Sequence, residues 1–499
     1  MSGLLVKKPL VSIQSEAKGD HLRRVLGPWA LTALGIGAVI GSGIFVTTGR
    51  AAHDIAGPAL VVSYVVAGIT CLLAALCYAE FASMTPVAGS AYTYAYTTLG
   101  EIFAWIIGWD LVLEYAVGAS TVAAGWSHYF SNFLTILPQE WGLSIPKAFN
   151  EAPLTYDEKQ GFKWTGHYAN VPAMIIVALL SLVLVKGIRE SANMNAVMVV
   201  IKVGAVLFVI AVGAFFINPD NWVPFDPYGW FGLSFFGEQI LGEYRTPDGA
   251  APAGMLAGAA IIFFAYIGFD AVSTQAEEAK NPQRDVPFGI IASLIICTVL
   301  YIGVVVVLTG MVKYDQIDTK AGVSQAFAHP NVGMNWAKGM IAAAALAGLT
   351  SVLLVMLLGS ARVLMAMSRD GLLPPFFSSV HSQFKTPWKG QIAVGLFAIV
   401  MAGLLPLDAL LEMTNIGTLF AFAVVCTSVV VMRYTNPTAA RPFRCPGAPF
   451  LPLLGVAACV LLMLALPSQN WVRLFLWMAI GLAIYFTYGR LHSKLAQNP

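Results

Sequence analysis

Long runs of apolar residues, separated by charged or Pro- and Gly-containing breaks, dominate this sequence of 499 residues. A helix needs about 20 mainly apolar residues to cross the roughly 30 Å hydrocarbon core of a bilayer. Only 11% of the residues are charged and the mean hydropathy is +0.74, whereas a soluble globular chain carries about 25% charged residues. The sequence therefore predicts an all-α integral membrane protein.

The apolar runs predict twelve transmembrane helices. Their expected bounds are 27–49, 58–80, 92–127, 171–187, 195–217, 254–278, 287–311, 337–367, 390–405, 411–432, 449–466 and 470–489. An even number of crossings returns the C-terminus to the side of the N-terminus. Two of the connecting loops, about 128–170 and 218–253, are long, and we expect them to be partly ordered segments at the membrane surface.

The Lys and Arg residues are unevenly shared between the two sets of loops. Roughly two thirds of the 28 fall on the side of the termini, and short cytoplasmic loops are the ones enriched in Lys and Arg. We therefore expect a multi-pass protein of the plasma membrane with both termini in the cytoplasm. The net charge of +2, without a dense basic stripe, excludes a nucleic-acid partner, and no GxxxxGK[ST] loop is present to bind a nucleotide.

The first predicted span contains the segment GIGAVIGSGIF, residues 35–45, with four glycines and a serine. Glycine inside a helix costs about 1 kcal/mol relative to alanine. One explanation is close packing of small residues between helices. The other is a helix broken around Gly41 to Gly43, whose freed backbone amides point into a cavity at the positive end of a half-helix and face an anionic group.

The sixth predicted span contains a second glycine-interrupted segment, FFAYIGFD, residues 263–270. Its aromatic residues are also typical of a helix core or of interface anchors. However, spans one and six are equivalent if spans one to five and six to ten form two repeats of opposite topology. Interrupted helices at matched positions are the best sequence indication of a transporter's midplane site. Released carbonyl groups near Phe264, Ala265 and Ile267 would then receive an ammonium group.

Three charged residues fall at membrane depth. Lys202 lies inside the fifth span, where an unpaired ammonium costs about 2.5 to 3.5 kcal/mol. Either it snorkels to the cytoplasmic face or it has an internal role. Asp110 and Glu114 are spaced i, i+4 and share one helix face, so at least one of them should face protein or water. The seven histidines form no cluster, and we expect no metal, no cofactor and no enzymatic activity.

Several motifs in the right order resemble one known family. GIGAVIGSGIF, CYAEFASMTPVAGSAYTYAY, IGWDLVLEYAV, FFAYIGFDAVSTQAEEAKNPQRDVP, SRDGLLP and TNIGTLFAF are similar to segments of the amino acid-polyamine-organocation superfamily, especially bacterial members related to cationic amino acid transporters. The resemblance runs from about residue 20 to the C-terminal helices. It implies a leucine-transporter-like fold of two inverted five-helix repeats plus two helices. The implied parts are a cytoplasmic segment 1–25, the first repeat 26–217, an extracellular loop 218–253, the second repeat 254–432 and the last two helices with a cytoplasmic C-terminus, 433–499.

The resemblance also implies a site for the substrate's carboxylate at the first break and for its α-ammonium at the second. The matching residues are Ile40, Gly41, Ser42, Gly43, Ile44, Phe264, Ala265, Ile267 and Met356. Phe264 matches the gating aromatic residue of the family, and Met356 would line the side-chain pocket. Lys202 matches a fifth-span lysine of sodium-independent, proton-coupled relatives, with Thr350 and Ser351 as expected neighbours.

These expectations converge on a secondary active transporter that imports L-amino acids by alternating access, coupled to protons and independent of sodium. Its partners would be a small or neutral L-amino acid, protons and the lipid bilayer. The sequence leaves open an amino-acid exchanger of the same fold and a receptor that binds an amino acid without moving it. Glu114 is a candidate partner for a basic substrate side chain, although Met356 would crowd a long one.

Overall fold

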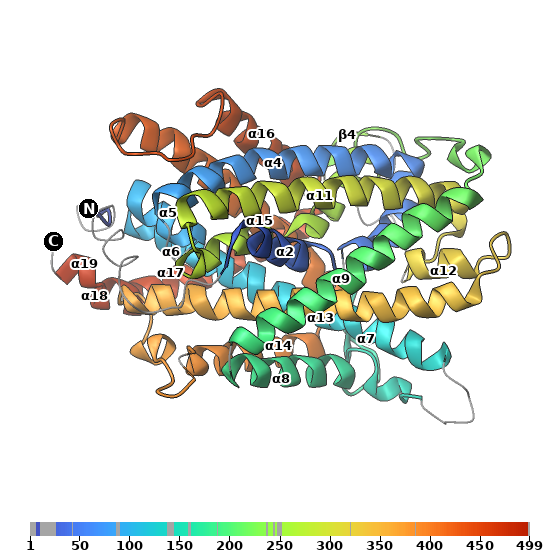
Figure 1. Ribbon diagram of the computed structural model, residues 1–499, viewed down its shortest axis with the longest axis horizontal. Coiled ribbons are helices and arrows are strands. Elements are labelled where there is room, and N and C mark those ends of the chain that lie inside the picture. The colour runs from blue at the N-terminus through green and yellow to red at the C-terminus, as the bar shows by residue number, and fades with distance from the viewer. Residues whose placement is uncertain are drawn as a thin grey trace.

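The computed structural model describes residues 6–9, 26–41, 43–85, 90–136, 144–157, 161–186, 188–235, 238–242, 245–246, 252–319, 321–384 and 386–497. Within them, eight helical stretches are long and apolar enough to cross a membrane, and three further apolar helices are shorter. The protein is therefore a multi-span helical membrane protein. Most of the long helices lie along the long axis of the molecule, while α9 crosses the others at a slant (Figure 1).

The principal helices follow the predicted apolar runs. They are α2 (Pro28–Val39), α4 (Leu60–Met84), α6 (Glu101–Val112), α7 (Gly118–Ile136), α8 (Val171–Lys186), α9 (Ile188–Gly213), α10 (Met255–Ile262), α11 (Pro282–Met311), α13 (Asn335–Arg369), α14 (Trp388–Leu404), α15 (Leu407–Thr435), α16 (Phe450–Leu464) and α17 (Ser468–Ile484). Extensive packing joins α11 to α2 and α4, and α13 to α7 and α9. The centre of the molecule is thus formed by helices that are far apart in the sequence.

The third predicted span, 92–127, is wrong in its bounds. The structure has a separate helix α5 (Ser90–Thr98), and the chain then turns at Gly100, whose φ of +103° is a left-handed conformation. The backbone amides of Leu99 and Gly100 both bond to the Ala95 carbonyl, which closes α5. Only then do α6, the π-helical turn η4 (Leu113–Val117) and α7 follow. The prediction ran across this boundary because Thr97, Thr98 and Glu101 interrupt the apolar residues only briefly.

The all-α prediction also needs a correction in the two long loops. One contains an antiparallel hairpin of β1 (Leu154–Asp157) and β2 (Gly161–Trp164), and the other a hairpin of β3 (Leu233–Phe235) and β4 (Glu238–Leu241). Both hairpins pair strands of only three or four residues, and they lie outside the helical core.

Residues 6–9 and the helix α19 (Lys494–Gln497) lie at the same end of the molecule (Figure 1). The Lys8 ammonium pairs with the Asp370 carboxylate at 2.7 Å, and the Lys494 backbone amide donates to the Asp370 carbonyl at 3.1 Å. Asp370 follows α13 directly. Residues 8 and 494 therefore meet at the end of α13.

Candidate functional site

The first predicted span is broken at its glycines. α2 ends at Val39, Ile40 has an extended backbone with ψ of 103°, and the π-helical turn η1 (Gly43–Thr47) begins beyond it. Ser42 lies outside the described residues. The predicted break is therefore present, and it leaves carbonyl groups at the end of α2 that need partners from elsewhere.

The sixth predicted span is broken as well. α10 tightens into a 3-10 turn, η9 (Phe263–Tyr266), and a second 3-10 segment, η10 (Asp270–Glu278), follows. Between them Ile267 is extended. Gly268 has a φ of +113°, a backbone conformation that residues other than glycine rarely adopt. A Cβ atom on Gly268 would lie 3.0 Å from the Ala38 carbonyl oxygen. The second break therefore lies against the end of α2.

The two breaks are in direct contact. A Cβ atom added at Gly43 would lie 2.1 Å from Ala265 Cα, so the two backbones approach as closely as glycine permits. The position of Gly43 therefore agrees with both explanations of the glycine motif, a broken helix and close packing between helices. The Tyr301 hydroxyl of α11 lies 2.8 Å from the Val39 carbonyl and 3.0 Å from the Ala265 carbonyl, one on each broken helix. Sequence reasoning missed Tyr301, because one tyrosine in an apolar run forms no pattern.

Lys202 of α9 is fully buried, and its side chain closes the end of α2. Nζ lies 2.6 Å from the Gly37 carbonyl, 2.8 Å from the Ile40 carbonyl and 3.3 Å from Ser351 Oγ on α13. An ammonium carries three N–H donors, and three oxygens lie within reach of them. Snorkelling to the membrane surface is therefore wrong for Lys202, and the predicted contact with Ser351 is confirmed.

Two other candidates on α13 have different surroundings. The Thr350 hydroxyl donates to a carbonyl of its own helix and accepts from Trp126 Nε1 at 3.1 Å. Its predicted place beside Lys202 is wrong, because adjacent residues point about 100° apart around a helix. Met356 is buried with its sulfur close to Gly118 of α7, 3.2 Å from where a Cβ on that glycine would lie.

Three carboxyl groups, those of Asp110, Glu114 and Asp270, are buried in the helical core. Asp110 and Glu114 are both fully buried, which confirms that this helix face is turned to protein. Within the described part of the chain, none of their carboxylate oxygens has a hydrogen-bond partner. The Asp270 carboxylate accepts a hydrogen bond from the Tyr115 hydroxyl. The role of Glu114 toward a basic side chain stays a prediction.

The remaining substrate candidates lie at the two breaks, and η1 packs directly against η9. These buried residues are Ile40, Gly41, Ile44, Phe264 and Ile267. The residues that were selected from two segments more than 200 positions apart are therefore gathered at one place.

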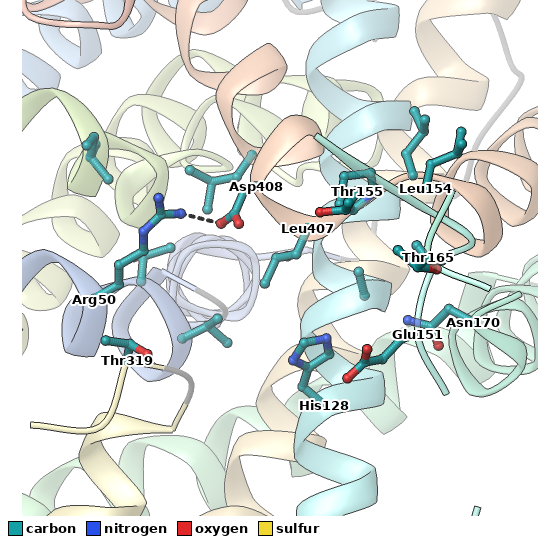
Figure 2. A pocket seen from close by; sticks show the side chains of 18 of the residues that line it. Arg50, His128, Glu151, Leu154, Thr155, Thr165, Asn170, Thr319, Leu407 and Asp408 are labelled. Carbon is teal, nitrogen blue, oxygen red and sulfur yellow. Dashed lines mark hydrogen bonds and ion pairs between the residues drawn. The ribbon is translucent and has the colours of Figure 1, made fainter. Parts of the chain in front are cut away.

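A cavity of about 370 Å³ lies beside η1, on the side of the β1–β2 hairpin. Val46 and Thr47 of η1 line it together with Ile261 of α10. Across it, Arg50 of the short helix α3 (Thr48–Arg50) forms an ion pair with Asp408 of α15, as Figure 2 shows. We call this the outer cavity. It lies next to η1, the helical turn that follows the first break.

Comparison with known proteins agrees with this architecture. The family model described as amino acid permease matches residues 26–486. The chain belongs to the amino acid permease family. This permease is 45% identical over 498 residues to the branched-chain amino acid permease BcaP of Bacillus subtilis, with 98% of each chain covered. It is 42% identical over 495 residues to the methylthioribose transporter of Bacillus subtilis, covering 99% of this chain and 100% of the relative.

A third relative links the permease to the group suggested by its motifs. The vacuolar cationic amino acid transporter 4 of Arabidopsis thaliana is 37% identical over 442 residues, which cover 88% of this permease and 68% of the relative. The superfamily resemblance is therefore confirmed, and the protein is a transporter and not an enzyme.

Proposed function

We propose that this permease imports small or neutral L-amino acids together with protons, without sodium, by alternating access. The observation that carries the proposal is the contact of Lys202 with the Gly37 and Ile40 carbonyls at the end of α2. The carbonyl end of a helix attracts a cation, and an amine, unlike a metal ion, changes its charge by releasing one proton. Lys202 therefore offers a proton site directly beside the first break.

Coupling follows from what this contact joins. When Lys202 is protonated, its ammonium ties α9 to α2, and Ser351 extends the tie to α13. When the proton leaves, one N–H donor and the positive charge are lost, and the end of α2 is held less firmly. Release of the proton toward the cytoplasm thus frees α2 to move, and the substrate leaves on the same side.

The two breaks offer complementary charge to an amino acid. Backbone amides around Gly41 and Gly43 lie at the start of η1, which favours a carboxylate, and carbonyls released near Ala265 favour an ammonium group. A zwitterion fits this pair of ends. Support for amino acids comes from the family and from the relative named a branched-chain amino acid permease. Met356 against Gly118 favours a short or neutral side chain over a long cationic one.

Alternating access requires a particular architecture. We propose twelve crossings, with residues 26–217 and 254–432 as two inverted five-helix repeats, 433–499 as the added pair of helices, and both termini in the cytoplasm. The position of the two breaks supports this division, because each falls in the first span of its proposed repeat.

Uptake into proteoliposomes tests the proposal. The purified permease should concentrate labelled leucine or alanine when the inside is alkaline and sodium is absent, and a protonophore should abolish the gain. An exchanger would require amino acid inside the vesicle, and a receptor would bind without uptake. Labelled arginine and methylthioribose belong in the same panel, since relatives are named for cationic amino acids and for methylthioribose. Accumulation of methylthioribose alone would overturn the amino-acid proposal.

A further inference from the structure

A groove of about 620 Å³ runs along the outside of α11, between this helix and the loop 436–449 that follows α15. On α11 it is lined by Arg284 at one end and then by Phe288, Ile291, Ala292 and Ile295, and the loop contributes Phe443. From Arg284 to Ile295 the helix rises about 16 Å, which is about half of the hydrocarbon core of a bilayer. The groove therefore begins at a basic residue and continues over apolar side chains for the depth of one leaflet.

The loop forms a fixed wall of this groove. The Phe443 backbone amide donates to Ser83 Oγ of α4 at 3.2 Å, and the Cys445 amide donates to the buried Glu80 carboxylate at 2.7 Å. Arg441 also bonds to Glu80, at 3.2 Å. These bonds hold Phe443 in place without an occupant, so the groove is preformed, as small-molecule sites usually are.

The charges around the groove favour an anion. Arg284 and Arg444 of the loop are exposed, and neither forms an ion pair within the described part of the chain, whereas Arg433 and Arg441 both pair with Glu80. None of the described residues that line the groove is acidic. A phosphate suits the guanidinium of Arg284. The ammonium of a zwitterionic headgroup, by contrast, would find no carboxylate in this lining.

We propose that this groove holds one anionic phospholipid of the cytoplasmic leaflet. Its phosphate binds Arg284, and one acyl chain lies along α11 between Phe288 and Ile295. Anionic headgroups attract basic residues at the membrane surface, and the exposed Phe288 and Ile295 offer apolar surface to the chain. The leaflet follows from the proposed orientation, whereas the site itself is independent of what the permease transports.

The groove also adjoins the first broken helix. The Phe288 ring packs edge to face against Trp29 in the first turn of α2, with ring centroids 5.4 Å apart. An acyl chain on Phe288 therefore lies beside the contact between α11 and α2. Because a ligand that binds only the folded protein stabilises it, the bound lipid should raise the temperature at which the permease unfolds.

Native mass spectrometry of the purified permease tests the site with two lipids of the same acyl chains, phosphatidylglycerol and phosphatidylcholine. The wild type should retain one phosphatidylglycerol in preference to phosphatidylcholine. Arg284→Gln should weaken that binding about fivefold, the ratio that one basic residue near an anionic lipid supplies. Arg490→Gln is the matched control, because Arg490 is exposed and does not line the groove. Equal retention of the two lipids by the wild type, or equal binding by the two variants, would overturn the inference.

A second pair of variants tests the acyl chain without a change of charge. Ala292→Phe fills the groove from α11, whereas Ala483→Phe adds the same ring at an exposed position of α17 outside the groove. Ala292→Phe should lose both the retained phosphatidylglycerol and the rise in unfolding temperature, and Ala483→Phe should keep both, with gel filtration to check that each variant is folded. Normal retention by Ala292→Phe would refute the site. Neither measurement requires transport, so failure of the proposed function would leave this test unaffected.

Discussion

The proposed proton coupling depends on Lys202, so replacing this residue tests it directly. Lys202→Ala removes both the charge and the contacts with α2, and Lys202→Arg keeps a charge that does not leave in a protein. Both variants should therefore lose accumulation driven by an inward proton gradient in sodium-free proteoliposomes. Lys186→Ala, at an exposed end of α8, is the control and should accumulate normally. If Lys202→Ala still concentrates amino acid under these conditions, the coupling role is wrong.

Gly43 and Gly41 allow a matched comparison within one motif. A Cβ at Gly43 meets the backbone of Ala265 at 2.1 Å, whereas a Cβ at Gly41 meets the end of the Val352 side chain at 2.5 Å. Backbone cannot rotate away and a side chain can. Gly43→Ala should therefore cost about 1 to 3 kcal/mol of stability, as overpacking does, and Gly41→Ala clearly less. Thermal unfolding in detergent measures both, and equal losses would contradict the close approach of the two breaks.

At the scale of elements, Tyr301 fastens α11 to both broken helices through one hydroxyl. Tyr301→Phe leaves the Val39 and Ala265 carbonyls without this donor, and an unsatisfied buried polar group costs about 1 to 3 kcal/mol. We expect weaker substrate binding as well as lower stability, because both breaks are affected. Tyr266→Phe removes a hydroxyl that donates to the Tyr64 carbonyl of α4, 2.8 Å away, and should mainly lower stability. Equal effects on binding, measured with labelled amino acid, would argue against a special role for Tyr301.

The elements show what the sequence could and could not predict. Both helix breaks were predictable, because glycine is costly inside a helix and recurs at matched positions. The choice between Thr350 and Ser351 was not, since the rotation of a helix about its axis depends on packing against its neighbours. The separate helix before Gly100 was missed because the polar break Thr97–Glu101 is short, and the turn depends on the left-handed backbone of one glycine. Tyr301 needed the fold itself, which brings two distant carbonyls together.

At the scale of the whole molecule, sidedness is the open prediction. The Lys280 amide donates to the Leu26 carbonyl at 2.8 Å, so residue 283 lies near the start of α2. Residue 155 lies in the β1–β2 hairpin. A cysteine at 283 should react only from the cytoplasm, and one at 155 only from outside. The six native cysteines are buried, which keeps the background of an impermeant thiol reagent low. Labelling of position 283 in sealed cells would reverse the proposed orientation.

Glu101, at the start of α6, is hydrogen-bonded to residues that are synthesised much later than it is. Its buried carboxylate accepts hydrogen bonds from the Tyr96 and Tyr485 hydroxyls, at 2.8 Å each, and from the Ser493 hydroxyl. Two of these donors, Tyr485 and Ser493, follow Glu101 in the chain by 384 and 392 residues. During synthesis the Glu101 carboxylate therefore has its full set of hydrogen-bond donors only after these much later residues have been made.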